Sequence, residues 1–163
     1  MSKTMTSLLL ALCVSLSAQA YAGSLDDSMA TLKANITKLG EPKLEGTAKA
    51  GDQEVPVLYF GKKKINGNYD AVDNVKKKHG GTATVFVASG DEFICVTTNV
   101  LKGDGTRGVG IALPHGKAYA AIKKGEGFCG EVEILKSMYD TCYEPIKDAA
   151  GKTLGIFYVG IKK

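Results

Sequence analysis

Few residues in this chain have the types and spacing that catalysis or metal binding requires. The two histidines, His79 and His115, stand far apart, and no cysteine pair has the Cys-x-x-Cys spacing. No segment has the Gly-x-Ser-x-Gly pattern that exposes a nucleophilic serine. Zinc, attached haem and thioredoxin-type redox chemistry therefore lack a sequence motif. We expect neither an enzyme nor a bound cofactor.

A glycine-rich run at residues 103–110 contains Arg107 and superficially resembles a phosphate-binding loop. Such a loop joins a strand directly to a helix, whereas this run leads into Pro114, so tight turns explain its glycines better. Arg107 has two interpretations of equal weight. Its guanidinium either binds a ligand carboxylate or bonds carbonyl groups of its own loop.

The N-terminus has the features of a secretory signal peptide. Lys3 is followed by an apolar run at residues 8–16 and by small side chains near Ala20 and Ala22. We expect cleavage after Ala22, with cleavage after Ala20 as the alternative, and a mature periplasmic domain at residues 23–163. The apolar run is far shorter than the ~20 residues that span a membrane.

The remaining chain has the length of one domain. The formal net charge of the full sequence is +4, which becomes about +3 when Lys3 is removed with the leader, and lysines cluster only at residues 62–64 and 76–78. Nucleic-acid binding requires a denser basic stripe with interleaved aromatic residues, so we exclude it.

Apolar residues spaced by three and four predict an amphipathic helix at residues 25–39. Residues 40–52 are polar and glycine-containing, which predicts a loop. The short apolar run at 55–60 contains a proline, which suits an edge strand or an extended segment. A short helix is expected at residues 70–78.

The second half of the chain has the composition of an antiparallel sheet. Runs rich in β-branched and aromatic residues alternate with turns, and a long insertion at residues 101–127 follows the second run. Connections of this length inside a compact domain tend to be functional. The five predicted strands are residues 82–88, 92–100, 128–135, 139–146 and 154–161. Together these elements predict an α+β fold.

Strand alternation selects candidates for a ligand site. In the second strand Cys95, Thr97 and Asn99 share one face, and the opposite, more aliphatic face suits packing against the N-terminal helix. In the fourth strand Tyr139 and Tyr143 share a face, and tyrosines supply an apolar wall with a polar tip. We therefore expect these five residues near a pocket.

Three stretches carry a resemblance to a known family. Residues 58–87, 93–110 and 139–160 are similar to the single Cache domain family, the extracytoplasmic sensor relatives of the PAS fold. The resemblance implies a long N-terminal helix and a five-stranded sheet ordered 2-1-5-4-3, with the pocket on one face. It also places Arg107 at the mouth of that pocket.

The resemblance implies a binding function. Its expected ligands are an organic acid, an amino acid or an amine, and its expected partners are a membrane-bound signalling protein and a second copy of the chain as a homodimer. Two alternatives stay open. One is an interaction module without a ligand, and the other is a cysteine-based metal- or haem-binding protein.

Three cysteines remain after removal of the leader, and in an oxidising compartment two of three usually pair. Cys129 and Cys142 lie on the third and fourth strands, which form a hairpin, so we expect a disulfide between them and a free Cys95 on the pocket wall. Direct pairing requires a two-residue loop at Leu135 and Lys136, although the turn signal lies slightly further along. In the family that the chain resembles, the position of Cys95 is frequently an arginine, so its loss weakens the case for a simple carboxylate ligand.

Overall fold

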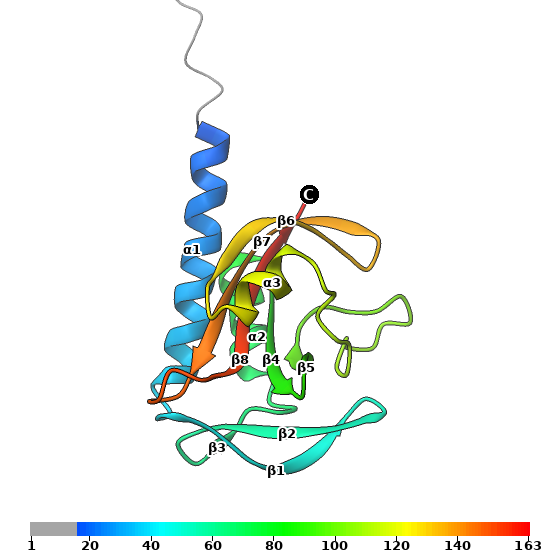
Figure 1. The fold of residues 1–163 in the computed structure, drawn as a ribbon. Helices are drawn as coiled ribbons and strands as arrows, with labels where there is room; N and C mark the ends of the chain where they lie inside the picture. The colour runs from blue at the N-terminus through cyan, green and yellow to red at the C-terminus, as the bar shows by residue number, and fades with distance from the viewer. Residues whose placement is uncertain (1–15) are drawn as a thin grey trace, which may run out of the picture.

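The computed structural model describes residues 16–163 of the chain, and side chains from residue 24 onward. Residues 1–15, most of the expected signal peptide, lie outside the described residues, so the leader stays a prediction. The described part is an α+β fold of three helices and two antiparallel sheets (Figure 1).

The helices and strands divide into two halves along the chain. The first half contains α1 (Leu16–Thr37), β1 (Pro42–Ala50), β2 (Gln53–Phe60), β3 (Lys63–Lys64) and α2 (Asp70–His79). The second half contains β4 (Thr82–Ser89), β5 (Glu92–Thr98), α3 (Lys117–Lys123), β6 (Phe128–Ile134), β7 (Ser137–Lys147) and β8 (Thr153–Lys162).

The five strands β4 to β8 form one antiparallel sheet with the order β5-β4-β8-β7-β6, which is the order that the resemblance implies. Each predicted strand is present, with bounds within two residues of those expected from composition. Helices α1 and α2 pack on one face of this sheet, and α3 lies over part of the other face (Figure 1).

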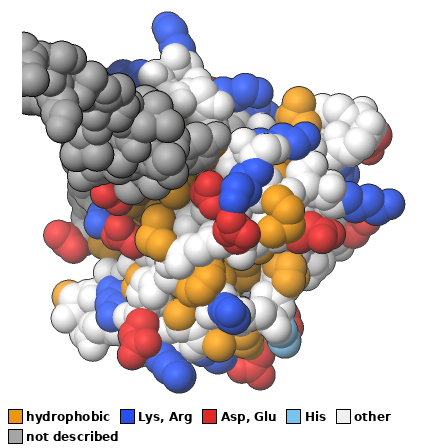
Figure 2. Space-filling view, turned by 90° about the horizontal axis from the view of Figure 1, so that it is seen from above, with side chains coloured by type: hydrophobic (Ala, Val, Ile, Leu, Met, Phe, Trp, Pro, Cys, Tyr) orange, Lys and Arg blue, Asp and Glu red, His pale blue; other side chains and the backbone are white. Residues whose placement is uncertain are grey.

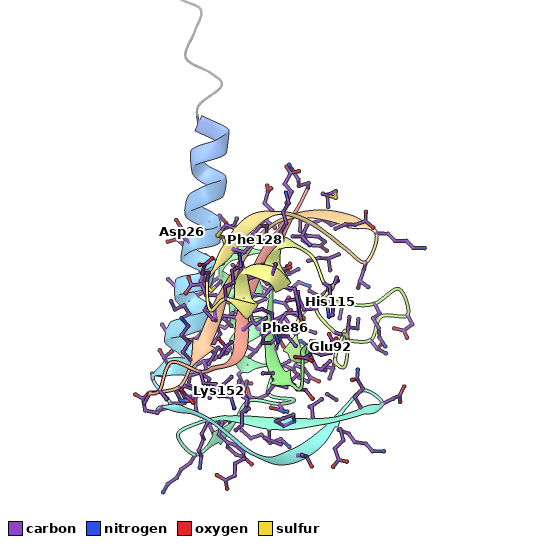
Figure 3. All side chains as sticks on the ribbon, in the orientation of Figure 1. Asp26, Phe86, Glu92, His115, Phe128 and Lys152 are labelled. Carbon is purple, nitrogen blue, oxygen red and sulfur yellow. A yellow bond between two sulfur atoms is a disulfide. The ribbon has the colours of Figure 1, made fainter. Side chains whose placement is uncertain are left out.

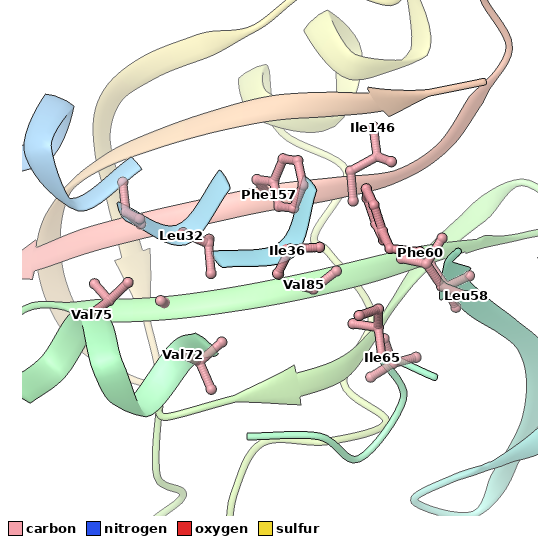
Figure 4. Close-up of a cluster of buried hydrophobic side chains, with 14 of the residues drawn as sticks. Leu32, Ile36, Leu58, Phe60, Ile65, Val72, Val75, Val85, Ile146 and Phe157 are labelled. Atoms are coloured by element: carbon pink, nitrogen blue, oxygen red, sulfur yellow. The ribbon is translucent and has the colours of Figure 1, made fainter. Parts of the chain in front are cut away.

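The main hydrophobic core lies between α1, α2 and the sheet (Figure 4). The predicted stripe of α1 is buried at Leu25, Met29, Leu32 and Ile36, because this spacing places all four on one side of the helix. Leu39, the last residue of the predicted helix, is exposed because α1 ends at Thr37.

The prediction of a loop at residues 40–52 is wrong over most of its length. Residues 42–50 form β1, which pairs with β2 and is interrupted by a bulge between Leu44 and Thr47. This strand is mostly exposed, so it lacks the apolar alternation by which strands are recognised.

The proline-containing strand β2 is not an edge strand, because it lies between β1 and β3. Strand β3 pairs only with Tyr59 and Phe60, so Pro56 never has to donate to it. The Asn66 side chain continues the pairing instead. Its Oδ1 accepts from the Leu58 N–H at 2.9 Å, and its Nδ2 donates to the Pro56 carbonyl oxygen at 3.1 Å.

Candidate functional site

A cavity of about 160 Å³ lies on the face of the five-stranded sheet opposite α1. Side chains from β4, β5, β7 and β8 form its floor, and Figure 3 shows Phe86 among them near the centre of the molecule. The floor residues are Thr84, Phe86, Cys95, Thr98, Tyr143 and Tyr158.

The connection between β5 and β6 forms one wall of the cavity. Ala112 makes an isolated antiparallel bridge with Ile94, and the Cys95 N–H donates to the Ile111 carbonyl oxygen at 2.9 Å. The Leu113 N–H donates to the Phe93 carbonyl oxygen at 2.8 Å. Because this stretch bonds to the edge of the sheet as an added strand would, the wall is part of the fold and not a free loop.

Gly110 lets the β1–β2 turn pack against the back of this wall. Its φ is 89°, and a Cβ at this position would lie 2.6 Å from the Ala50 carbonyl oxygen. The Gln53 Nε2 donates to the Gly110 carbonyl oxygen at 2.8 Å. The small three-stranded sheet therefore supports the cavity wall from outside.

The β6–β7 hairpin forms the opposite wall through Val132, Ile134 and Leu135. Ile134 pairs with Ser137, so the turn consists of Leu135 and Lys136, whose φ values are 47° and 64°. This pair of left-handed residues matches the twist of a two-residue hairpin turn, although neither residue is the glycine, asparagine or aspartate that usually signals it.

A β-bulge in β5 changes which side chains face the cavity. Phe86 of β4 pairs with Cys95, but the preceding residue, Val85, pairs with Thr97, so Val96 is an extra residue. An extra residue reverses the alternation of the side chains that follow it. Of the three residues expected on the pocket face, Cys95 therefore lines the cavity, whereas Thr97 and Asn99 do not.

Beyond the bulge, Thr98 and Val100 line the cavity and the expected residues point to the other face. The Thr97 Oγ1 donates to the Asn68 carbonyl oxygen at 2.7 Å. Asn99 is buried, and its Nδ2 donates to the Val72 carbonyl oxygen at 2.6 Å. Thr97 and Asn99 thus hold the segment around α2 against the sheet.

Arg107 also lies away from the cavity. Its guanidinium donates to both carboxylate oxygens of Asp73, at 2.7 and 2.9 Å, and to the Thr98 carbonyl oxygen at 2.8 Å. The guanidinium also stacks over the Tyr69 ring at 4.2 Å from its centre. The Asp73 carboxylate raises the pKa of Arg107. These contacts match the structural interpretation of Arg107.

The two expected tyrosines differ in their positions. Tyr143 lines the cavity, and its ring centre lies 4.9 Å from that of Tyr158 on the neighbouring strand. Tyr139 is buried near the start of β7, four residues before Tyr143, and is not among the residues that line the cavity.

The titratable groups on the cavity floor are held in their neutral forms. Burial raises the pKa of the Cys95 thiol to about 12 and that of the Tyr143 hydroxyl to about 12. Burial also raises the pKa of Tyr158. A site with such groups offers apolar contact and neutral hydrogen bonds.

The threonine hydroxyls of the floor are also hydrogen-bonded. The Thr98 Oγ1 donates to the Ala83 carbonyl oxygen at 3.2 Å and lies 2.6 Å from the Thr84 Oγ1. Either hydroxyl can be the donor in this pair. In the arrangement in which Thr98 donates to the Ala83 carbonyl oxygen, Thr84 donates to Thr98, and the Thr84 oxygen is left as an acceptor.

The predicted disulfide between Cys129 and Cys142 is confirmed. The two residues pair directly across β6 and β7, with their Cα atoms 4.1 Å apart, and Cys95 is free and buried. Cys142 belongs to the core cluster on the α1 side of the sheet, whereas Cys95 belongs to the cluster on the cavity side. The free thiol and the disulfide are therefore separated by the sheet.

Two wider hollows lie on the surface elsewhere. One, of about 380 Å³, lies between α1, β3 and α2, and the other, of about 320 Å³, lies beside Arg107. Both are lined largely by charged and amide side chains. Ligand sites are usually more apolar, so the cavity on the sheet is the better candidate.

Within residues 16–163, no group of three or more histidine, cysteine, aspartate or glutamate side chains is placed to hold a metal ion. His115 pairs with Glu92 on the surface at 2.9 Å (Figure 3). The His115 ring also stacks on the Tyr119 ring. In this same part of the chain, no helix is both long and apolar enough to cross a membrane.

Several cavity residues were not predicted from the sequence. Tyr158 and Thr84 could have been found by applying strand alternation to β8 and β4, as was done for β5 and β7. Thr98 and Val100 could not, because the bulge at Val96 has no glycine or other sequence signal. The wall at residues 108–114 was recognised only as a long connection.

A helical layer on one face of a five-stranded antiparallel sheet and a pocket on the other face define a PAS-like α+β domain. The sequence profile of the Cache 3/Cache 2 fusion domain matches residues 3–163, and the chain belongs to this Cache family. Domains of this family are extracytoplasmic sensor modules that generally bind small molecules. No curated protein and no solved structure matches the chain.

Proposed function

We propose that the protein works in the periplasm as a small-molecule-binding sensor domain, with its ligand in the cavity on the sheet. The observation that supports this best is the cavity itself, which four strands, a sheet-bonded connection and a hairpin surround. Small-molecule sites are typically concave and largely apolar, with a few placed polar groups, and this cavity has that composition.

Binding suits the cavity better than catalysis does. A cysteine attacks as its thiolate, and burial raises the pKa of Cys95 to about 12, so the thiol form predominates at neutral pH. The hydroxyls of Thr84 and Thr98 bond to each other and to backbone groups, and in the described part of the chain neither is hydrogen-bonded to a histidine or a carboxylate.

Export and cleavage are part of the proposal. The buried stripe of α1 begins at Leu25 among the side chains that the structure describes, so a chain that begins at Gly23 or Tyr21 keeps all of it. A membrane-bound signalling protein is the proposed partner, because a periplasmic sensor needs a route across the membrane.

A thermal-shift screen of the mature protein tests this function. Amino acids, carboxylates, amines and neutral small molecules should include at least one stabiliser, because a ligand that binds only the native state adds RT ln(1 + [L]/Kd) to its stability. At a hundred times Kd this amounts to about 2.7 kcal/mol.

Two tryptophan variants on the same connection give a matched control. Ile111 lines the cavity and is 39% exposed, whereas Leu101 is 50% exposed and does not line it. Ile111→Trp should abolish the shift by filling the cavity, and Leu101→Trp should keep it. A flat screen together with a concentration-dependent mass would instead favour the interaction module.

A further inference from the structure

The walls and floor of the cavity contain no basic side chain among the described residues. Arg107 is the single arginine of the sequence, and its guanidinium donates to both carboxylate oxygens of Asp73, away from the cavity. A carboxylate placed against this floor loses part of its hydration and gains no opposite charge, which is unfavourable.

A buried ammonium group meets the same difficulty. The acidic residue at the cavity, Glu133, is exposed and lies on the outer hairpin, so it stays in contact with water. The Cys95 thiol and the Tyr143 hydroxyl are neutral because burial disfavours their anions. Hence neither a carboxylate nor an ammonium group of a ligand meets a buried side chain of opposite charge in this cavity.

The volume of the cavity limits the size of its ligand. An apolar cavity of about 150 Å³ in an unrelated protein stays dry and binds one benzene molecule. The present cavity of about 160 Å³ is similar in volume, but it opens to solvent beside the exposed side chains of Ile111 and Leu135. Its inner part is lined by Phe86, Leu113 and Ile134. One six-membered ring with a small substituent therefore fits.

Two hydroxyl groups determine what that substituent is. When Thr98 donates to the Ala83 carbonyl oxygen, Thr84 donates to Thr98 and its oxygen stays free to accept. Tyr143 keeps its phenolic proton, because burial raises its pKa. A substituent that both donates and accepts, such as an amide or an alcohol, matches this pair.

From these observations we propose that the site takes an uncharged, one-ring molecule with a single amide or hydroxyl group, and rejects its carboxylate and ammonium counterparts. This inference rests on the proposed function, since it names the ligand class of the same cavity. It narrows the expected ligands, because organic acids, amino acids and charged amines fall outside that class.

Two matched pairs of probes test the inference by isothermal titration of the mature protein. Benzamide and benzoate have nearly the same shape and differ in charge, and so do benzyl alcohol and benzylammonium. The neutral member of each pair should bind at least about 100-fold more tightly than the ion, because the ion is buried without a partner.

Two threonine variants separate the polar contact from general packing. Thr84→Val keeps the shape of the side chain and should weaken benzamide about five- to tenfold, with little effect on toluene, because one hydrogen bond is lost. Thr97→Val is the control, because the Thr97 hydroxyl bonds to the Asn68 carbonyl oxygen on the other face of the sheet.

Each outcome has a distinct meaning. Equal or tighter binding of benzoate or benzylammonium overturns the inference and leaves the proposed function standing. Failure of all the neutral probes overturns the inference as well, and if the broader screen of acids and amines is also flat, the proposed function fails with it.

Discussion

The guanidinium of Arg107 holds the carboxylate of Asp73 at two points, with Nη1 2.7 Å from Oδ1 and Nη2 2.9 Å from Oδ2. This pair fastens the connection after β5 to α2. The sequence alone is equally consistent with Arg107 at the mouth of a ligand pocket. Only the ion pair with Asp73 distinguishes a structural role from a ligand-binding one.

Arg107→Ala should therefore lower stability and leave ligand affinity unchanged. We expect a loss of about 1 kcal/mol in urea unfolding, because the pair is partly exposed and screened by solvent. Arg107→Lys should retain part of this stability, since it keeps the charge and loses the two-point geometry. Unchanged stability with a tenfold loss of benzamide affinity would identify a ligand-binding arginine instead.

Gly110 offers a test of how the cavity wall is supported. Gly110→Ala places a Cβ against the Ala50 carbonyl oxygen in a left-handed backbone conformation, so we expect a loss of about 1 to 3 kcal/mol in unfolding free energy. Gly103→Ala on the same connection is the control, because a Cβ there meets nothing within 4 Å. Similar losses in both variants would show that the close contact with Ala50 is not what matters.

The disulfide should contribute substantially to stability. Cys129 and Cys142 are separated by 13 residues, and closing a loop of this size is worth about 3 kcal/mol in the chain-entropy description. The double variant Cys129→Ser/Cys142→Ser should lose about that much in urea unfolding. Non-reducing peptide mapping of the unmodified protein should recover the Cys129–Cys142 linkage, and a linkage through Cys95 would refute the assignment.

The buried thiol of Cys95 should make the folded protein less stable at alkaline pH. Its pKa is about 12 in the folded protein against 9.0 for a free thiol, so the folded state keeps a proton that the unfolded state gives up. The contribution of the Cys95 thiol to the free energy of unfolding is therefore fully present below pH 9. It falls by about 1.4 kcal/mol per pH unit as the pH rises from 9 toward 12.

Urea unfolding of the unmodified protein and of Cys95→Ala at pH 8, 9 and 10 measures this contribution. The free energies of unfolding of the two proteins should approach each other between pH 9 and 10, because the variant lacks the thiol that titrates. Parallel curves would mean that the thiol is not held neutral by burial.

The five strands of the large sheet were predictable because they are rich in β-branched and aromatic residues, and three of them, β4, β5 and β8, are buried on both faces. Leu25 and Ile36 likewise marked the buried stripe of α1 through their helical spacing. Strand β1 gave no such signal, since most of its side chains are exposed. Burial, and not strand propensity alone, thus made an element visible in the sequence.

The candidate site was only partly predictable, and the reason is register. One extra residue at Val96 exchanges Thr97 and Asn99 for Thr98 and Val100 at the cavity. The turn at Leu135 and Lys136 sets the pairing of Cys129 with Cys142, yet neither turn residue is typical of a left-handed turn. Long-range packing decides both features, so local sequence does not show them.

Hydrophobic side chains also reach the surface of the molecule, where Figure 2 shows them among charged residues. Met138 and Leu135 are exposed at the β6–β7 hairpin, which forms one wall of the cavity.

A ligand that binds in the cavity contacts this hairpin, so it should slow amide hydrogen exchange at residues 132–138, with little change in α2. Uniform protection across the chain would place the ligand elsewhere or show only a global gain in stability.

Native mass spectrometry of the exported protein, incubated with benzamide and with benzoate, tests the central claim most directly. The account predicts a chain that begins at Gly23 or Tyr21, contains one disulfide and carries one benzamide. Ile111→Trp should abolish this binding. A chain that retains its leader, or one that carries benzoate in preference to benzamide, would contradict it.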